Sequence, residues 1–121
     1  MTIGAAEAAL PDARDLVWVD LRPTLGREQS GVRPALVLTN RGFHQRNATA
    51  IICAVTSNVA PWPTKVILPN GLAVSGAVLC DQIRCVDRTM RGFRPIGKVP
   101  ADVLKDVRGT VANLLGLHLD L

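Results

Sequence analysis

The sequence predicts a small β-barrel with one amphipathic helix at its C-terminal end. Short apolar runs alternate with stretches rich in proline, glycine and polar residues, which is the spacing of an all-β barrel rather than of alternating strands and helices. After residue 100 the apolar residues change to helical spacing. A length of 121 residues suits one domain that buries one hydrophobic core.

Six segments have the composition of β-strands, with β-branched and aliphatic residues between turn-forming residues. In one of them Pro34, which lacks an N–H, belongs at the first residues of a strand or at a sheet edge. The same proline disfavours helical geometry at Arg33 and favours an extended backbone there. The polar segments 40–47 and 57–63 read as loops. The predicted strands are 16–21, 33–39, 48–56, 64–68, 77–86 and 94–99.

The C-terminal segment has the pattern of a helix. Pro100 suits the first turn of that helix, and Gly116 suits its end. We expect this helix to cover the open side of the barrel. The residues that share its apolar face are Val103, Leu104, Val107, Val111, Leu114 and Leu115.

The ends of the chain and its cysteines indicate a cytoplasmic protein. Residues 1–14 lack the basic start and the uninterrupted apolar core of a signal peptide, so we expect a flexible arm there, followed by a single domain over residues 15–121. No apolar run approaches the length of a membrane span. Cys53, Cys80 and Cys85 are an odd number of cysteines without metal-ligand spacing, and we expect three buried free thiols in a reducing compartment and no metal site.

The net charge of +4 is concentrated in two basic blocks. Residues 22–46 hold five arginines against Glu28, and residues 84–98 hold five basic residues against Asp87, which gives +4 for each block. Such blocks indicate either a solvated surface or a polyanionic partner. Aromatic residues make up 3% of the chain and tyrosine is absent, which argues against a nucleic-acid reader that stacks several bases on a sheet of aromatic rings.

Three residues have the chemistry of a metal-free phosphoryl-transfer site. Arg33 offers a fixed fork of donors to phosphate oxygens, Thr56 adds a neutral donor, and Glu28 can accept a proton from a hydroxyl. Together they suit a reaction in which a 2′-hydroxyl of RNA attacks its own adjacent phosphate, because the substrate supplies the nucleophile. Each residue taken alone is equally typical of a solvated surface or a turn.

A longer set of motifs resembles the MazF/PemK family of toxin endoribonucleases. "DLVWVDLRPTLGREQSGVRPALVLTN" (15–40), "AVTSN" (54–58), "DQIRCVD" (81–87) and "RPIGKVPADVLKDV" (94–107) occur in the family's order, so that the resemblance spans roughly residues 15–117. It implies an SH3-like barrel of the PemK/CcdB-like kind with a C-terminal helix, working as a homodimer. It also implies the toxin of a type II toxin–antitoxin system.

The activity implied by the resemblance is sequence-selective cleavage of single-stranded RNA without a metal ion or other cofactor. The expected target is messenger RNA, so that translation and growth are inhibited. The expected products carry 2′,3′-cyclic phosphate and 5′-hydroxyl ends. The acidic C-terminal segment of a cognate antitoxin is the expected protein partner.

The motifs also carry expectations for single residues. Arg33 in "GVRPA" and Thr56 in "AVTSN" match the family's catalytic arginine and threonine, and Glu28 in "GREQSG" matches a loop carboxylate implicated in some members. Trp18 is expected in the core. Arg14 departs from the glycine that members usually have before the first aspartate. The residues expected to contact RNA are Arg27, Gln29, Ser57, Trp62, Gln82 and Arg84.

Two other functions fit the same fold class. A gyrase-poisoning toxin of the CcdB type shares the architecture and needs no arginine–threonine pair, but this chain ends "GLHLDL" rather than in the Trp-Gly-Ile expected there. The other alternative is a non-catalytic SH3-like binding module.

Overall fold

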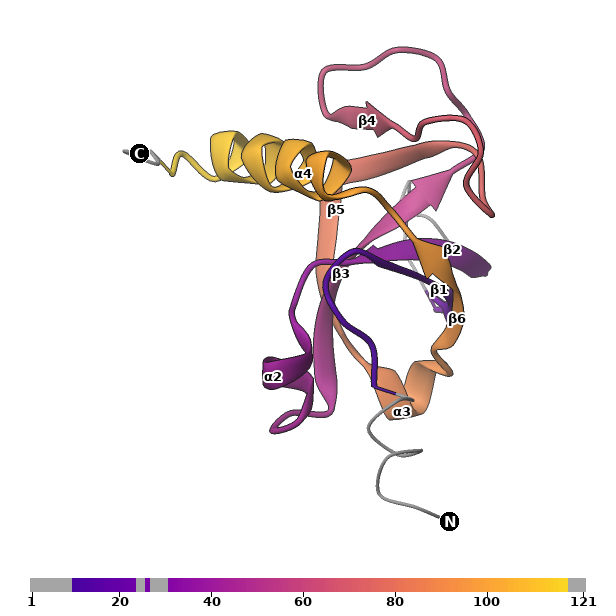
Figure 1. The fold of residues 1–121 in the computed structure, drawn as a ribbon, viewed down its shortest axis with the longest axis vertical. Helices are drawn as coiled ribbons and strands as arrows, with labels where there is room; N and C mark the ends of the chain where they lie inside the picture. Colours follow the sequence, from indigo (N-terminus) through magenta and orange to yellow (C-terminus); the bar gives the residue numbers. More distant parts are fainter. Residues whose placement is uncertain (1–9, 24–25, 27–30, 118–121) are drawn as a thin grey trace.

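The computed structural model describes residues 10–23, 26 and 31–117. Within this part of the chain, six strands form one antiparallel sheet in the order β4-β5-β3-β2-β1-β6, and the sheet curls strongly (Figure 1). The strands are β1 (Asp15–Asp20), β2 (Val32–Val37), β3 (Thr49–Thr56), β4 (Lys65–Ile67), β5 (Ala77–Asp87) and β6 (Arg94–Lys98). The predicted class, a small β-barrel with a C-terminal helix, is confirmed. The helices are α2 (Arg41–His44), α3 (Arg88–Arg91) and α4 (Ala101–Leu114).

The short helices α2 and α3 were not predicted. Each begins at a polar side chain that accepts hydrogen bonds from the first turn: Asn40 accepts from the Phe43 N–H, and Asp87 accepts from the N–H groups of Thr89 and Met90. Asn and Asp are strong N-cap residues, but they are equally common in turns. One helical turn without an apolar face therefore reads as a loop in the sequence.

A sharp bend in β5 gives the sheet its curl. β3 and β5 pair at Cys53 with Ile83 and resume at Val55 with Val78, so residues 79–82 of β5 stand opposite Ala54 alone. Extra residues on one strand bend it and increase its twist. Figure 1 shows the resulting turn in the path of β5. Its first half pairs with β4 and the end of β3, and its second half pairs with the start of β3.

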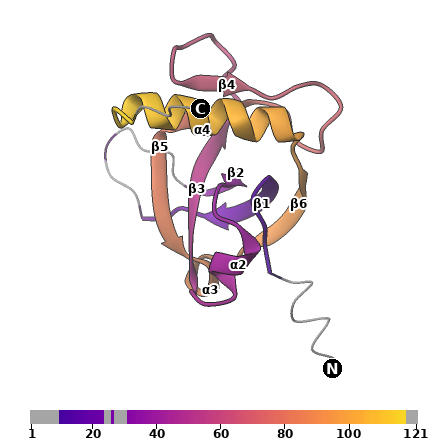
Figure 2. The same cartoon turned by 60° about the vertical axis from the view of Figure 1, so that its left-hand side comes forward.

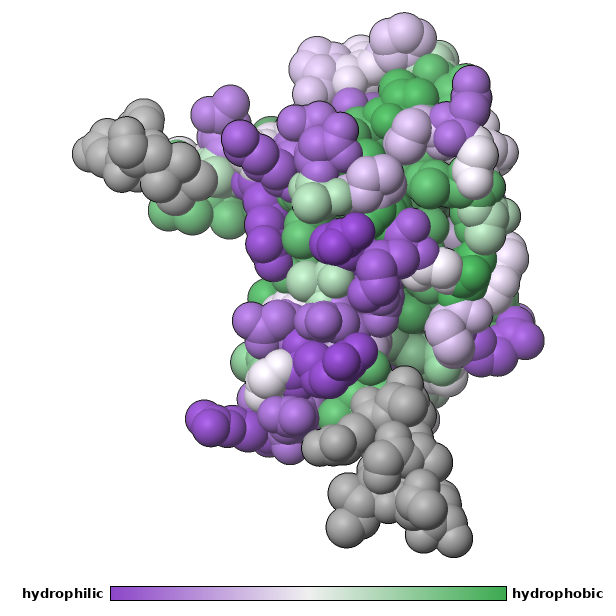
Figure 3. Space-filling model, viewed as in Figure 1, coloured by the Kyte–Doolittle hydropathy of each residue, from purple (hydrophilic) through white to green (hydrophobic). Residues whose placement is uncertain are grey.

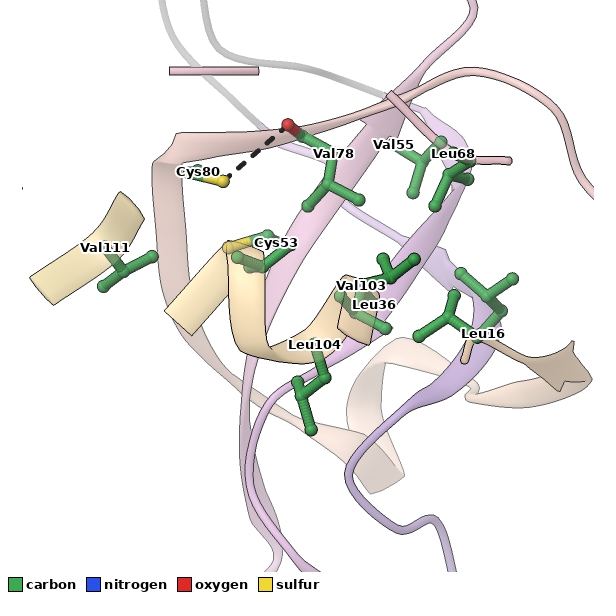
Figure 4. Close-up of a cluster of buried hydrophobic side chains, with 12 residues drawn as sticks. Leu16, Leu36, Cys53, Val55, Leu68, Val78, Cys80, Val103, Leu104 and Val111 are labelled. Atoms are coloured by element: carbon green, nitrogen blue, oxygen red, sulfur yellow. Dashed lines mark hydrogen bonds between the residues drawn. The ribbon is translucent and has the colours of Figure 1, made fainter. Parts of the chain in front are cut away.

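Two hydrophobic clusters lie on the two faces of the sheet. Side chains alternate between the faces, so Leu16 and Leu36 join one cluster while Val17 and Val37 join the other. Helix α4 covers the first cluster and crosses the upper parts of β3 and β5 (Figures 2 and 4). The helix residues that join this cluster are Val103, Leu104, Val107 and Val111.

Two residues of the predicted helix face are not buried. Leu114 and Leu115 are 47% and 61% exposed. They lie at the end of α4, which extends past β5 and has no strand beneath it there (Figure 1). Gly116 follows with φ +71°, which is the left-handed conformation expected after a helix end.

The cysteines do not all share one environment. Cys53 and Cys80 are buried, and burial raises the pKa of Cys53 to about 12 and that of Cys80 to about 11. Cys85 is exposed, which contradicts the expectation that all three thiols are buried. The reason is strand alternation, because Val86 takes the buried position next to it.

Buried His44 connects the N-terminal segment to the barrel. Its Nδ1 lies 2.7 Å from the Pro11 carbonyl oxygen and its Nε2 lies 2.7 Å from Thr39 Oγ1. A carbonyl can only accept, so Nδ1 carries the hydrogen and Nε2 accepts from the hydroxyl. Thr39 Oγ1 in turn accepts from the Ile51 N–H at 3.2 Å. This chain of hydrogen bonds ties the segment before β1 to α2 and β3.

Arg14 has a backbone conformation that glycine adopts more readily. It has φ +80°, a left-handed conformation that costs energy for a residue with a side chain. Its Nε donates to the Val99 carbonyl at 2.9 Å, and its N–H donates to the Val37 carbonyl at 3.1 Å. These contacts offset the strain and join the residue before β1 to the end of β2 and to Val99, which follows β6.

Gly76 fixes the end of β3. Its φ is +138°, and a Cβ there would overlap the carbonyl oxygen of Thr56 and lie 3.2 Å from the carbonyl carbon. Only glycine allows the two backbones to approach this closely. Its own carbonyl accepts from the Leu68 N–H at 2.9 Å, which leaves the segment little freedom to move away. The position of Thr56 therefore depends on a residue in the β4–β5 loop.

We predict that His44→Leu lowers the free energy of unfolding by about 2 kcal/mol, because it leaves the Pro11 carbonyl and the Thr39 hydroxyl without their buried partner. Urea denaturation of the purified protein measures this change. Phe43→Leu is the matched control, since Phe43 is 38% exposed and its loss costs less. Equal stability of the His44 variant and the wild type would contradict the prediction.

We predict that Gly76→Ala lowers the free energy of unfolding by about 2 kcal/mol or more, because the clash with Thr56 adds to the strain of a positive φ. Gly71→Ala separates the two effects, since Gly71 has φ +90° but nothing lies within 4 Å of an added Cβ. Its expected cost is about 1 kcal/mol. Denaturation curves that show the same loss for both variants would rule out the close approach as the cause.

Candidate active site

The register of β2 and β3 brings Arg33 and Thr56 to the same end of the sheet. The last pairs are Leu36 with Cys53 and Ala35 with Ala54. Two residues further along that register, Arg33 stands opposite Thr56. Both residues line one cavity of about 340 Å³. An arginine and a threonine separated by 22 positions of sequence thus share one site.

The Thr56 hydroxyl is held in a fixed position. Thr56 is 7% exposed, and its Oγ1 accepts a hydrogen bond from the Asn58 N–H at 3.2 Å. Because the hydroxyl accepts there, its own proton can be donated to another group. Lys65 holds the loop that follows Thr56, because its Nζ donates to the carbonyls of Asn58 at 3.0 Å and Ala60 at 3.1 Å.

Arg33 is exposed and its backbone is restrained by Pro34. The pairing of β2 with β3 ends at Ala35, so at Pro34 the β3 side of β2 is a free edge where the missing N–H costs no ladder hydrogen bond. On the other side Arg33 pairs with Val19 of β1. The arginine therefore extends from a strand rather than from a loop, as expected from the sequence.

A second cavity continues the site along the same face of the sheet. Side chains two residues apart on a strand share a face, so Arg33 and Thr56 lie on the face of Ala35 and Ala54. Ala54 also lines a cavity of about 480 Å³. The bend of β5 opposite Ala54 puts the bulged segment against this space. Its other lining residues are Leu21, Asp81, Gln82, Ile83, Arg84 and Cys85.

The remaining expected site residues fall into three groups. Gln82 and Arg84 line the second cavity, and Ser57 lines the first. Trp62 is 64% exposed on the loop after Thr56 and lines neither cavity. Arg27, Glu28 and Gln29 lie outside the described residues.

The two ends of the segment that carries Glu28 are held beside the second cavity. Leu21 lines that cavity, and its N–H donates to the Gly31 carbonyl at 2.9 Å. Arg22 pairs with Asp20 at 2.9 Å, and its hydrogen bonds lower the pKa of that carboxyl to about 2. Arg91 Nη1 donates to the carbonyls of Asp20 at 3.2 Å and Arg22 at 2.7 Å. Helix α3 thus holds the residues at the end of β1 in place.

Trp18 belongs to this region, and its expected place in the core was wrong. It is 37% exposed and lines the first cavity with Arg33 and Thr56. Val17 and Val19 on either side are buried at 2% and 0% exposure on one face, so Trp18 must point to the other. The alternation within "LVWVDL" carries that signal. Helix α4 covers Leu16 on Trp18's face, but Trp18 lies beyond this cover.

Comparison with known proteins agrees with the architecture and with the motifs. The family model described as "PemK-like, MazF-like toxin of type II toxin-antitoxin system" matches residues 12–115. The chain is 32% identical over 107 residues to the endoribonuclease toxin MazF of Escherichia coli strain K12, an alignment that covers 88% of this chain and 96% of that protein.

Two solved structures from Deinococcus radiodurans are also similar. The chain is 42% identical to MazF, with a TM-score of 0.86 over 89% of this chain and 98% of that one. It is 40% identical to a chain in a MazE–MazF crystal structure, with a TM-score of 0.81 over 90% of this chain and 99% of that one. These matches span nearly the whole chain, and the protein therefore belongs to the PemK-like, MazF-like toxins of type II toxin–antitoxin systems.

Proposed function

We propose that this endoribonuclease toxin cleaves single-stranded RNA by transphosphorylation at the end of the sheet where Arg33 and Thr56 meet. The 2′-oxygen of the substrate forms a bond to the adjacent phosphorus, and the bond from phosphorus to the 5′-oxygen of the next nucleotide breaks. The products are a 2′,3′-cyclic phosphate and a 5′-hydroxyl. The reaction needs no cofactor, because the nucleophile belongs to the substrate. The observation that carries the proposal is the shared cavity of Arg33 and Thr56.

Arg33 and Thr56 are assigned to the phosphate. The guanidinium donates to the non-bridging oxygens, where negative charge grows as the phosphorus becomes five-coordinate. The Thr56 hydroxyl donates a further hydrogen bond, and the Asn58 N–H holds it in place for this role. Groups fixed before the substrate binds need no reorganisation during the reaction, which is the main source of such stabilisation.

Proton abstraction is assigned to Glu28, and hydrogen bonding to the leaving oxygen is assigned to Arg33. Glu28 takes the proton of the attacking 2′-hydroxyl, since a carboxylate can act as a base and an arginine cannot be deprotonated in ordinary surroundings. The leaving 5′-oxygen takes its proton from solvent water, and Arg33 donates a hydrogen bond to that oxygen. An adjacent arginine lowers the pKa of a carboxyl group, so Glu28 is a weak base and relies on its position.

RNA is proposed to follow the two cavities. Gln82 and Arg84 lie along the second cavity, Ser57 lies in the first, and exposed Trp62 is available for a base on the loop after Thr56. Arg27 and Gln29 are assigned to the same RNA from the segment that carries Glu28. Messenger RNA offers long single-stranded stretches, which makes it the proposed substrate. Its cleavage would stop translation and growth.

The proposed partners follow from charge and from exposed apolar surface. The basic blocks favour the acidic C-terminal segment of an antitoxin, and the similar Deinococcus toxin was solved with MazE. Leu114, Leu115 and Leu117 are 47%, 61% and 55% exposed, and a second copy in a homodimer would cover such surface. Among the described residues no helix is long and apolar enough to span a membrane. We place the toxin in the cytoplasm, where its RNA substrate is.

We predict that Arg33→Ala lowers the cleavage rate by at least about 100-fold, because the main charge on the transition state is lost. Purified protein is incubated with single-stranded RNA in EDTA, and the cleavage ends are mapped. Arg46→Ala is the matched control, since Arg46 is exposed and lines neither cavity. Full activity of a folded Arg33 variant would refute the assignment.

The same assay separates the other functions. Cleavage of RNA by the wild type in EDTA is the expected result. A DNA–gyrase cleavage complex without RNA cleavage would instead show a gyrase poison. Binding of RNA or protein without any cleavage would show a binding module.

We predict that RNA affinity falls as salt rises, because arginine–phosphate contacts release counterions. The probe is an oligonucleotide with a 2′-deoxy group at the attacking position, so that binding is measured without cleavage. Arg84→Ala is expected to reduce the slope of log affinity against log salt by about 0.7, the value for one phosphate of a single strand. An unchanged slope would place the RNA away from the second cavity.

A further inference from the structure

Trp18 lies in a row of three side chains that crosses β2, β1 and β6. It pairs with Pro34 on one side and with Arg94 on the other. Directly opposed residues on antiparallel strands present their side chains on the same face. A proline, a tryptophan and an arginine are therefore neighbours on one face of the sheet. All three groups have flat or apolar surfaces on which a nucleobase can stack.

Away from Arg33 and Thr56, the walls of the first cavity are those of a base site. Among the described residues that line it, Arg33 alone is charged. The other lining side chains are apolar or carry a hydroxyl, such as Val74 and Ser75 of the β4–β5 loop. The second cavity differs, because Asp81, Gln82 and Arg84 line it. The part of the first cavity away from Arg33 therefore favours a neutral aromatic ring over a second phosphate.

The face of Trp18 continues into a third cavity that is lined by two arginines. This cavity of about 410 Å³ shares Val32 with the first and is also lined by Asp20, Arg91 and Arg94. Figure 3 shows hydrophobic surface on the side of the molecule where β1, β2 and β6 lie, with hydrophilic surface next to it. Val32 is 47% exposed between the two cavities. A strand of RNA that leaves Arg33 over Trp18 therefore meets arginines next.

We propose that Trp18 stacks the base of a nucleotide adjacent to the cleaved phosphate, and that Arg94 contacts the next phosphate along the chain. The inference rests on the proposed RNA cleavage and deepens it by dividing the substrate between two faces. One flanking nucleotide enters the first cavity with Trp18, and the other enters the second cavity with Gln82 and Arg84. The scissile phosphate lies between them at the end of the sheet, where Arg33 and Thr56 line the first cavity.

A protein partner could bind the Trp18 side chain in place of a base. An apolar side chain of an antitoxin could cover the same indole. The cavity walls favour the base, because Arg33 and Thr56 border the same space and a nucleotide bound to them has its base within reach. The experiment must therefore detect contact between a nucleobase and Trp18, and not only that some ligand fills the cavity.

The first test combines a protein change with a change in the substrate. Trp18→Leu is expected to weaken binding of the 2′-deoxy oligonucleotide by about 5- to 100-fold, the range for loss of one stacked base. Trp18→Phe is expected to retain most of the affinity. An oligonucleotide that is abasic at the stacked position should bind wild type and Trp18→Leu equally well, because neither then makes the contact.

The controls separate stacking from folding and from the proposed function. Phe43→Leu removes an aromatic residue of matched exposure, 38%, that lines neither the first nor the third cavity, and it should leave affinity unchanged. The loss of affinity from Trp18→Leu can also be compared with the loss from an abasic site on either side of the phosphate. If the two losses simply add at both positions, the inference is overturned while RNA cleavage stands. Absence of cleavage by the wild type would overturn the proposed function instead.

The second test uses fluorescence. The chain has two tryptophans, so Trp62→Phe leaves Trp18 as the sole indole. Saturating this variant with the 2′-deoxy oligonucleotide should quench its emission, and the oligonucleotide that is abasic at the stacked position should not. Quenching of equal size by both oligonucleotides would show that no base lies on the ring.

Discussion

The structure depends on the register between β2 and β3. That register places the start of one strand opposite the end of the other, and it does so with alanines at the last pair, Ala35 and Ala54. Small side chains there leave space on the concave face, and the bend of β5 opens next to it. A slip of one residue would turn every side chain of the strand to the other face. The guanidinium and the hydroxyl would then no longer face the same space.

Polar contacts hold the loops around this pair of strands. Arg88 Nη2 donates to the carbonyls of His44 at 3.0 Å and Asn47 at 2.7 Å, which joins α3 to the end of α2. Arg91 does the same for the start of the loop after β1. Several arginines of the basic blocks therefore serve the backbone of this chain. Net charge counted from the sequence overstates the charge that is available to a polyanion.

Much of the fold could be predicted from residue patterns, but the site could be predicted only in part. Each strand was found within two residues of its predicted bounds because proline and glycine mark the turns, as at Pro23 and Gly71. The bulge of β5 has no such mark in the sequence, because residues 79–82 have the same mixture of apolar and polar residues as a regular strand. Trp18 was misplaced because its face is buried at Leu16, whereas the cover that α4 gives to this face ends before Trp18. Leu114 and Leu115 were misplaced for a different reason. The helical spacing of apolar residues continues through them, but the helix there has already passed the edge of the sheet.

The exposed thiol of Cys85 gives this protein a chemical handle. Burial keeps Cys53 and Cys80 protonated, whereas Cys85 is exposed in the wall of the cavity that also holds Gln82 and Arg84. A maleimide dye would therefore attach beside the candidate RNA groove without any engineered cysteine. The natural sequence already carries an attachment point for distance measurements between toxin and substrate.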